Sequence, residues 1–575
     1  MHPSLRLQWL GALALILVSA PALAQRTHVN GVTGEPVDVA NNWVHPAAPD
    51  GNPYPRSTAS AADLALRDSI AQLGKSVFWD EQVSSDNTVS CGTCHMPRAG
   101  GTDNRLGAVN GNGNFGAFGV IPQAVSVFGT VDYGFLAPPS PQIDRSVTPL
   151  APPTMIGAYM FDRLFWDERA GPDFDDGFGF PLPLFGDWAA LEDLAVGPPT
   201  SSVEMGHEGI DWTSGFIQTK LGDSFPLAMV DPSTIPADVA WIPAIGAPYS
   251  KVFDIVFAAH SNPALASGGG VTRERFAAAV AHYHRTLIPD QAPIDLGTMT
   301  RNQINGFHIV DRAGCFRCHS ATGSPALNGA GQVVDPFDSL FSDGQSHDIN
   351  ISGGIRRKTA TLRNVGLHVK FFSTGHGGDG STRVFVNNQS DLLDFFENEP
   401  PPLGTGPLSA SDRADLGDFL FHALTDPRVA AETFPFDRPQ LYSELHPFEG
   451  NEYGTGTAAP GGFLVPEIIA NSPPQILPSG GPSWFKIGVG NAPANAPAWL
   501  FLDPAPAPGP VFWVSGPAIT LPANPTNADG IGTYQQPVAF TTAMLGVPFY
   551  AQWMVLDGRY GRAFSDAAEF FPFHW

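Results

Sequence analysis

The chain has 575 residues and a formal net charge of −25, since 55 acidic side chains outnumber 30 lysines and arginines. A surface this acidic disfavours nucleic acid, which binds to clustered positive charge, and it would attract basic protein partners. The length indicates several domains, and 62 glycines with 56 prolines indicate a globular chain that is rich in loops.

The first 24 residues have the pattern of a secretory signal. A basic Arg6 precedes an apolar run at residues 10–18, and Ala22-Leu23-Ala24 forms a small-x-small cleavage site. The apolar run is too short to span a membrane, and no later stretch reaches about 18 uninterrupted apolar residues. We therefore expect a periplasmic protein without a membrane span after signal cleavage, and an extended, proline-rich lead-in at residues 25–60.

A helix is predicted from Ala61. Leu66, Ile70 and Leu73 have the spacing that places them on one face of this helix. Ser60 would cap its start and Gly74 would end it, because serine and glycine favour these two positions.

Two C-x-x-C-H motifs follow, and together they contain every cysteine of the chain. They are Cys91-Gly92-Thr93-Cys94-His95 and Cys315-Phe316-Arg317-Cys318-His319. This spacing lets two thiols bond the vinyl groups of one haem, while the adjacent histidine binds the iron. A zinc site would need further ligands nearby, and a redox dithiol does not require the histidine. The motifs predict two covalently bound haems c with His95 and His319 as axial ligands.

Further along the chain, residues 98–145 form a region rich in glycine and asparagine that we expect to be a loop. A second helix should begin near Thr272, and a third should cover about 411–424. His282 and His284 fall on the second helix, where ordinary surface or core positions are the simplest interpretation.

The character of the sequence changes after about residue 450. Short aromatic and β-branched segments, such as 484–489 and 511–514, alternate with Pro/Gly turns. This pattern predicts a β-sandwich of about 120 residues, for which we find no catalytic constellation.

Several further stretches resemble landmarks of the bacterial di-haem cytochrome c peroxidases, in the same order. They are residues 73–80 (LGKSVFWD), 153–154 with 165–169 (PT and FWDER), 191–198 with 203–206 (LEDLAVGP and VEMG), 285–287 (RTL), 314–315 (GC) and 361–365 (TLRNV). The resemblance covers roughly residues 61–424 and leaves out the C-terminal β region.

The resemblance implies a mainly α fold with two cytochrome-c-like helical domains. The expected domains are the signal peptide at 1–24, the lead-in at 25–60, a first haem domain at 61–290, a second at 291–449 and an all-β, sandwich-like domain at 450–575. In this family the first haem reduces peroxide, and the second receives electrons from a donor such as a small soluble cytochrome c. Trp166 matches the tryptophan between the haems, and Glu204 matches the distal glutamate that handles protons. Relatives are often dimers, so a homodimer is left open.

The first haem site departs from the family pattern in two ways. Leu194 stands where a hydrogen-bonding amide is usual, which would make the pocket drier. Many relatives have a histidine about 16 residues after the first motif, whereas this chain has none between His95 and His207. We therefore expect a first haem that is open without reductive activation. His207 could serve as a labile cap, although an ordinary loop histidine is the simpler interpretation.

The second haem should not have the family's usual methionine ligand. No methionine lies between His319 and Met544, and Phe396 falls near the usual ligand position. His376 is our first candidate for the sixth ligand, followed by His368 and His347. Imidazole in place of thioether would lower the reduction potential.

The family's calcium site between the two domains is also altered. Ala151 stands where an asparagine ligand is usual, and His368 and Lys370 replace a Thr-x-Pro whose carbonyl groups contribute. A lysine would repel Ca²⁺, so we expect weak or absent calcium binding.

These departures leave other functions open. An open first haem also occurs in the methylamine-utilisation di-haem enzyme, which oxidises a partner protein, and in di-haem rubber oxygenase, which uses O₂. Aromatic residues in the insertion at 171–188 could line an apolar channel, although core filling is the default explanation. Glu204 favours peroxide, because cleavage of the O–O bond needs a proton shuttle. A di-haem electron carrier is the non-enzymatic alternative.

Overall fold

The computed structural model describes most of the chain after residue 60. The described residues are 27–29, 36–38, 61–85, 87–103, 105, 116–117, 119–120, 124–127, 130–132, 146–174, 189–206, 209–320, 327, 329, 341–347, 356–375, 377–378, 383–384, 388–398, 404–445, 451–460, 465–469, 475–476, 483–490, 492–493, 495–506, 519–520, 524–525, 532–538, 542–544, 547–559 and 561–574. The predicted signal, the capping Ser60, His207, His376, most of the insertion and the segment 511–514 lie outside these residues.

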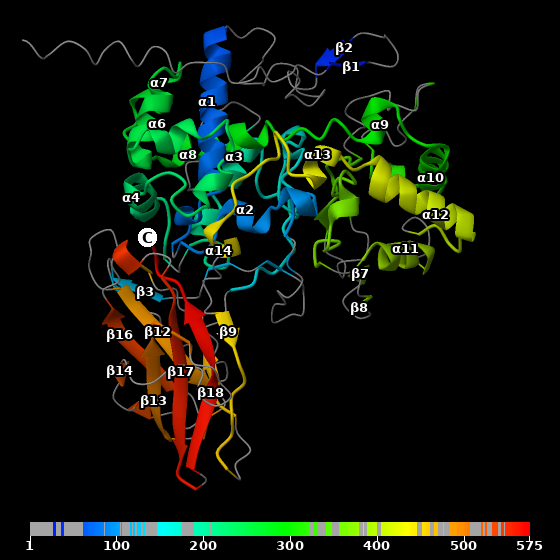
Figure 1. Ribbon diagram of the computed structural model, residues 1–575. Coiled ribbons are helices and arrows are strands. Elements are labelled where there is room, and N and C mark those ends of the chain that lie inside the picture. The colour runs from blue at the N-terminus through cyan, green and yellow to red at the C-terminus, as the bar shows by residue number, and fades with distance from the viewer. Residues whose placement is uncertain are drawn as a thin grey trace, which may run out of the picture.

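The described chain is rich in helices up to residue 445 and consists of strands after it (Figure 1). The helices of the first helical region are α1 Ala61–Phe78, α2 Cys91–Cys94, α3 Ala190–Ala195, α4 Phe216–Asp223, α5 Trp241–Ala244, α6 Tyr249–Phe257, α7 Pro263–Ser267 and α8 Arg273–His284. Those of the second helical region and the segment after it are α9 Pro293–Leu296, α10 Arg301–Arg312, α11 Gln389–Asn398, α12 Ala410–Asp418, α13 Pro427–Ala430 and α14 Tyr442–Leu445. Among the described helices, none combines the length and the apolar character that crossing a bilayer requires.

Helices α1 and α8 pack against each other at the centre of the first helical region. A side chain at Gly74 would place its Cβ 1.8 Å from the carbonyl oxygen of Ala279, so only glycine allows the two backbones this close. The predicted end of the first helix at Gly74 is therefore wrong: α1 continues to Phe78, and Gly74 serves helix packing. The predicted start of the second helix is confirmed, because the Thr272 hydroxyl caps α8.

The predicted third helix is confirmed and has an irregular end. Helix α12 continues as a π-helix at Phe419–Ala423, whose Phe419 and Leu420 are buried in the core of the second helical region. A wider turn of this kind re-aims side chains at a helix end and often occurs near functional sites.

After the second helical region, the chain returns to the first. Residues 426–445, which we call the return segment, carry α13 and α14 and bring Val429, Phe436 and Leu441 into the core of the first helical region. Figure 1 shows this segment running back between the two groups of helices. Each group of helices thus has its own core, and the return segment runs from the second group and packs into the core of the first.

Short strand pairs lie outside the C-terminal part. They are β1 Thr27–Val29 with β2 Pro36–Asp38, β3 Ala124–Val127 with β4 Thr130–Asp132, β5 Ser346–His347 with β6 Arg357–Lys358, and β7 Gly377–Gly378 with β8 Arg383–Val384. The second of these pairs falls in the region predicted to be loop, so that prediction is wrong at these strands.

The C-terminal part is built from two main sheets. Its strands are β9 Asn451–Tyr453, β10 Glu467–Ile469, β11 Gln475–Ile476, β12 Ser483–Gly490, β13 Pro497–Asp503, β14 Ile519–Thr520, β15 Asn524–Pro525, β16 Gly532–Val538, β17 Phe549–Asp557, β18 Gly561–Phe570 and β19 Phe573–His574. One sheet has the order β10-β12-β16, and the other the order β14-β13-β17-β18-β9, with β15 also on β13. Ile487 of the first and Trp553 of the second belong to one hydrophobic cluster. The sandwich-like arrangement stays our prediction for this domain.

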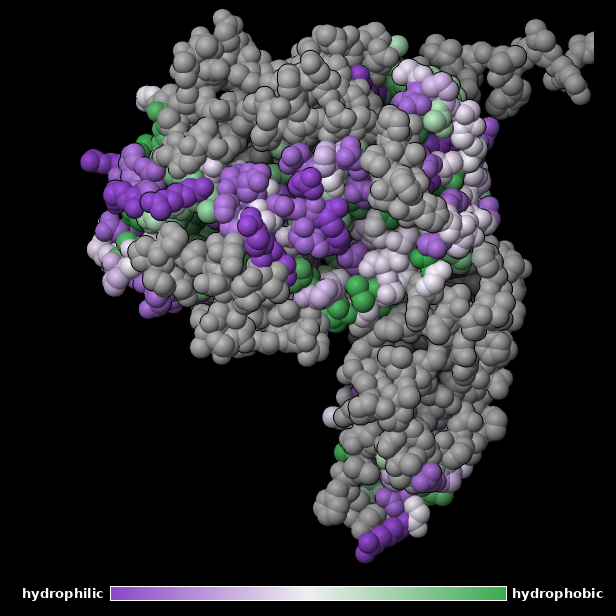
Figure 2. All heavy atoms as spheres, turned by 180° about the vertical axis from the view of Figure 1, so that it is seen from behind, coloured by the Kyte–Doolittle hydropathy of each residue, from purple (hydrophilic) through white to green (hydrophobic). Residues whose placement is uncertain are grey.

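The described surface of the helical part is mainly hydrophilic, as Figure 2 shows from behind, and hydrophobic residues occur on it only in scattered places. Two apolar pockets of the described helical residues lie beside the two C-x-x-C-H motifs.

Candidate functional site

The first motif is held in a single helical turn by its own side chains. Ser90 precedes α2, and its hydroxyl accepts the backbone N–H of Thr93, while the Thr93 hydroxyl accepts that of Ser90. This capping box fixes the turn that brings Cys91 and Cys94 to the same side. Gly92 lies against Trp79, where a Cβ would come within 2.2 Å of the indole ring.

The histidines of both motifs are oriented in the same way. Nδ1 of His95 donates to the carbonyl oxygen of Gly101 at 3.0 Å, and Nδ1 of His319 donates to that of Phe341 at 3.1 Å. Burial lowers the pKa of both rings, which keeps them neutral. A neutral imidazole whose Nδ1–H is engaged presents Nε2 as a metal ligand.

Burial disfavours the thiolate form of the motif cysteines. Burial raises the pKa of Cys91 and Cys94 to about 12 and that of Cys315 to about 11. A dithiol that exchanges disulfides needs the opposite shift, toward the thiolate. The electrostatics therefore argue against thioredoxin-like chemistry at either motif.

Each motif opens onto an apolar pocket. The first pocket, which contains Cys91, Cys94 and His95 in its wall, has a volume of about 1480 Å³ including its opening. The second pocket, beside Cys315, Cys318 and His319, has a volume of about 1830 Å³ including its opening. Both are large enough for a planar macrocycle, and each places a histidine ligand and two thiols at one wall.

The two pockets share a wall. It consists of residues 151–154 and 358–361 together with Trp166. The indole Nε1 of Trp166 donates to the carbonyl oxygen of Ala151 at 2.7 Å, and the backbone N–H of Lys358 donates to that of Trp166 at 2.9 Å. Two hydrogen bonds thus hold Trp166 in the shared wall, and its role as the tryptophan between the haems stays a prediction.

Glu204 is the one carboxylate among the described residues that line the first pocket. Its backbone is anchored, because its N–H donates to Ser201 and its carbonyl accepts from Val120. Burial raises the pKa of the Glu204 carboxyl, and the Arg169 guanidinium and the Ser201 hydroxyl oppose that rise. Burial thus favours the protonated form of the carboxyl and Arg169 the ionised form, and a carboxyl can serve as a general acid or base.

A small polar chamber adjoins the first pocket at Glu204. It has a volume of about 680 Å³ including its opening, and Phe165, Arg169 and Glu204 line both spaces. Hydroxyl-bearing Thr200 and Ser201 line its far side. The Arg169 guanidinium lies 3.5 Å from the centroid of the Phe165 ring. A cation and an aromatic face therefore lie where the chamber adjoins the first pocket.

The second pocket has a different lining. Phe371, Phe372, Phe395 and Phe396 are part of its wall, and the described residues around it include no carboxylate. Without a carboxylate, the described wall offers no acid–base group of the kind that Glu204 provides.

Two candidate ligands for the second pocket are among the described residues. His368 and His347 both line it, and burial lowers the pKa of His368 to about 4. His347 is engaged with Asp343 at 2.7 Å. His376, our first candidate, lies outside the described residues.

The structure adds residues that the sequence analysis did not assign to the site. His284 was interpreted as an ordinary histidine, yet it is buried and lines the first pocket, whereas His282 lies in the core. Lys358 lies in the shared wall with its ammonium 3.6 Å from the centroid of the Phe161 ring, and burial lowers its pKa to about 7. Its position three residues before the TLRNV landmark was the available signal for Lys358. For His284, the available signal was its position directly before the RTL landmark at 285–287.

Comparisons with known proteins show which proteins this chain is similar to. A family model described as di-haem cytochrome c peroxidase matches residues 68–303. The chain is 22% identical over 320 residues to cytochrome c551 peroxidase of Nitrosomonas europaea, covering 53% of this chain and 69% of that protein. It is 23% identical over 352 residues to cytochrome c551 peroxidase of Pseudomonas aeruginosa, covering 59% and 78%. For cytochrome c peroxidase of Escherichia coli, the identity is 23% over 336 residues, and the match spans about half of each protein, 55% and 53%.

Two solved structures match parts of this chain at low TM-scores. A MauG-like protein associated with microbial copper homeostasis covers 64% of this chain at a TM-score of 0.39 and 16% identity, and 92% of that protein is matched. A variant of the diheme peroxidase BthA from Burkholderia thailandensis covers 72% of this chain at a TM-score of 0.38 and 17% identity, with 96% of that protein matched. The family and sequence matches confirm the resemblance that the sequence motifs indicated.

Proposed function

We propose that this chain reduces hydrogen peroxide in the first pocket with electrons that enter through the second. Over residues 68–303 the chain belongs to the di-haem cytochrome c peroxidase family, and it is a peroxidase-like oxidoreductase with haem c cofactors. One peroxide takes up two protons and two electrons and gives two waters. The observation that carries this proposal is the position of Glu204, which lines the first pocket, while the described wall of the second has no carboxylate.

The residues around each pocket fit a covalently held haem. Cys91 with Cys94, and Cys315 with Cys318, would form the thioether bonds, and Nε2 of His95 and His319 would bind the irons. The haem supplies an iron that binds peroxide and stores electrons. Lys358 lies in the shared wall, where its amino group could pair with the carboxylate groups that a haem carries.

Glu204 moves the proton. Its carboxylate takes a proton from one peroxide oxygen and delivers it to the other, so that the O–O bond breaks with water as the leaving group. Arg169 keeps a fraction of the carboxyl ionised, and the Ser201 hydroxyl holds it in place. Peroxide reaches Glu204 through the polar chamber, whose opening is framed by Arg169 and Phe165.

Trp166 is the electron route between the pockets. Its indole belongs to the wall that the two pockets share, and its hydrogen bond to Ala151 holds the ring there. The sixth ligand of the second haem is a histidine, with His376 as first candidate and His368 and His347 behind it. The donor is a small basic redox protein such as a soluble cytochrome c, and the reaction takes place in the periplasm after removal of residues 1–24.

The proposal is tested by EPR spectroscopy of the purified, haem-loaded, fully oxidised protein. We expect a high-spin ferric signal. Addition of peroxide should then change the optical spectrum, and Glu204→Gln should lose this change. Two low-spin signals that do not respond to peroxide, even after one-electron reduction, would leave a di-haem electron carrier. An open first haem that reacts with O₂ but not with peroxide would instead indicate an oxygenase or a partner-protein oxidase.

A further inference from the structure

A short segment of the second helical region crosses to the first at the junction of the two pockets. His368 and residues 370–373 line the second pocket, and the backbone N–H of Ala151 in the shared wall donates to the carbonyl oxygen of Ser373 at 2.8 Å. The His368 ring lies directly on Gly100, where a Cβ would come within 2.5 Å of it. The two regions are therefore in close contact beside the first motif.

Lys370 is the charged member of this contact. Its ammonium donates to the carbonyl oxygen of Gly116 at 2.5 Å and pairs with a carboxylate oxygen of Asp103 at 3.4 Å. The Lys370 side chain is 2% exposed and that of Asp103 is completely buried. Burial lowers the pKa of Lys370, and the neighbouring Asp103 carboxylate opposes that shift. A buried ion pair with these additional hydrogen bonds is costly to break from one side.

The same carboxylate leads to the first motif. Arg105 binds Asp103 through Nε at 2.9 Å and through Nη2 at 3.0 Å, and its Nη2 lies 3.7 Å from the sulfur of Cys94. One carboxylate thus lies between two cations, one from each helical region. The chain Lys370–Asp103–Arg105 connects the second region to the edge of the first pocket.

A calcium ion does not fit this junction. Ca²⁺ takes six to eight oxygen ligands at about 2.3–2.6 Å. Ala151, at the position where the resemblance implies an asparagine ligand, has no side-chain oxygen. The ammonium of Lys370 is a donor without acceptor capacity, and its charge repels a second cation. The residues present already supply the positive charge that a bound metal would bring.

We infer that Lys370 is the resident cation of the junction: it fixes the two helical regions to each other in place of a divalent metal and sets the electrostatic environment of the first haem through Asp103 and Arg105. The chain is therefore independent of calcium. The inference rests on the haem-bearing fold, and it holds whether peroxide or O₂ is the oxidant.

The first test is titration of the haem-loaded, EGTA-treated full chain with CaCl₂ in a calorimeter, together with thermal unfolding in EGTA and in CaCl₂. We expect no saturable heat and no change in the unfolding midpoint. Saturable calcium binding at micromolar concentration, or a midpoint that falls in EGTA, would overturn the inference without any need for a variant.

The second test uses Lys370→Met, which keeps the length of the side chain and removes its charge. The unfolding midpoint should fall by roughly 3–6 °C, because Asp103 loses one of its two cations. The same loss of positive charge should lower the reduction potential of the first haem and leave that of the second unchanged. Lys251→Met, at an exposed position of α6, is the matched control. Equal behaviour of the two variants in both measurements would refute the role of Lys370. Neither readout depends on peroxide turnover, so its failure is distinct from failure of the proposed reaction.

Discussion

The two pockets have the same attachment chemistry and different walls. In each, a histidine donates Nδ1–H to a backbone carbonyl and two cysteines line the pocket. The first pocket adds Glu204 and a polar chamber, whereas the described lining of the second is aromatic and lacks a carboxylate. The difference teaches that the motif determines what is bound, while residues far from the motif determine what the bound group does.

The motifs themselves differ in how they are packed. Gly92 of the first motif lies against Trp79 with no room for a side chain, whereas Phe316, at the same place in the second, fills the core of its region. The first motif is therefore packed against Trp79, which lies outside the motif, whereas the second motif contributes its own Phe316 to the core.

The largest effect should come from removing the group that distinguishes the first pocket. Glu204→Gln should lower kcat for peroxide by roughly 10²–10⁴-fold, because an amide cannot accept the proton. The spectrum of the second haem should not change. Steady-state peroxide reduction measures this, with Asp223→Asn as an exposed carboxylate control in the same region. Retention of full turnover in Glu204→Gln would contradict a proton-transfer role for this residue.

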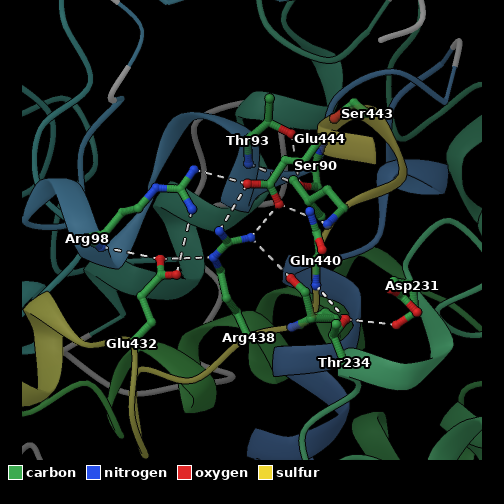
Figure 3. A network of polar contacts seen from close by, with 12 residues as sticks. Ser90, Thr93, Arg98, Asp231, Thr234, Glu432, Arg438, Gln440, Ser443 and Glu444 are labelled. Atoms are coloured by element: carbon green, nitrogen blue, oxygen red, sulfur yellow. Dashed lines mark hydrogen bonds and ion pairs between the residues drawn. The ribbon is translucent and has the colours of Figure 1, made fainter. Parts of the chain in front are cut away.

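The next effect concerns the return segment, which supports the first pocket from behind. Arg438 binds Glu432 at 2.9 Å and Glu444 at 2.5 Å, and Arg98 near the first motif joins the same carboxylates (Figure 3). Because Arg438 is 6% exposed and Arg98 is 41% exposed, we expect Arg438→Ala to destabilise the protein by about 2–3 kcal/mol, and Arg98→Ala by less than about 1 kcal/mol.

Urea unfolding gives these free energies, and amide hydrogen exchange locates the change. Faster exchange in α2 and in residues 426–445, with α10–α12 unaffected, is the expected pattern. Uniform loosening of both regions would mean that the return segment does not stabilise the first region selectively.

A smaller effect should follow from altering the wall that the pockets share. Trp166→Phe should slow electron transfer between the haems by about tenfold, equivalent to ~1.4 kcal/mol, without changing either potential. Stopped-flow reduction of the second haem followed by optical detection of the first measures the rate. Trp212→Phe is the matched control, since its indole also donates to a backbone carbonyl, at Val196, and lines neither pocket. Equal rates in the two variants would remove Trp166 from the route.

The smallest effect should be a shift in pH dependence. The base form of Glu204 is the active form, so kcat/KM should fall as pH decreases through its raised pKa, above the usual range of glutamate. The Arg169 guanidinium favours the carboxylate form of Glu204, so Arg169→Ala should move this limb to higher pH. The shift should be small, because the Arg169 side chain is 55% exposed and its charge is screened by solvent. The exposed Arg163→Ala should leave it unchanged. A limb that moves to lower pH would contradict the assignment.

The sequence allowed much of the helical architecture to be predicted, with errors where long-range contacts override local signals. The cap at Thr272 was predicted correctly because a hydroxyl followed by a regular apolar pattern is local information. Gly74 was misread as a helix end, since its actual cause, the carbonyl of Ala279 on another helix, is about 200 residues away. For the same reason, the interpretation of His284 as ordinary missed its place in the first pocket.

The sequence by itself predicted two covalently bound haems, because the C-x-x-C-H spacing that haem attachment requires is contained within five residues. It also indicated Glu204 and Trp166, through their places in motifs. Only the tertiary structure decided that the two pockets share a wall, that the return segment supports the first region, and that Lys370 reaches Asp103 across the junction. These features depend on groups brought together from distant parts of the chain, whose packing no local spacing encodes.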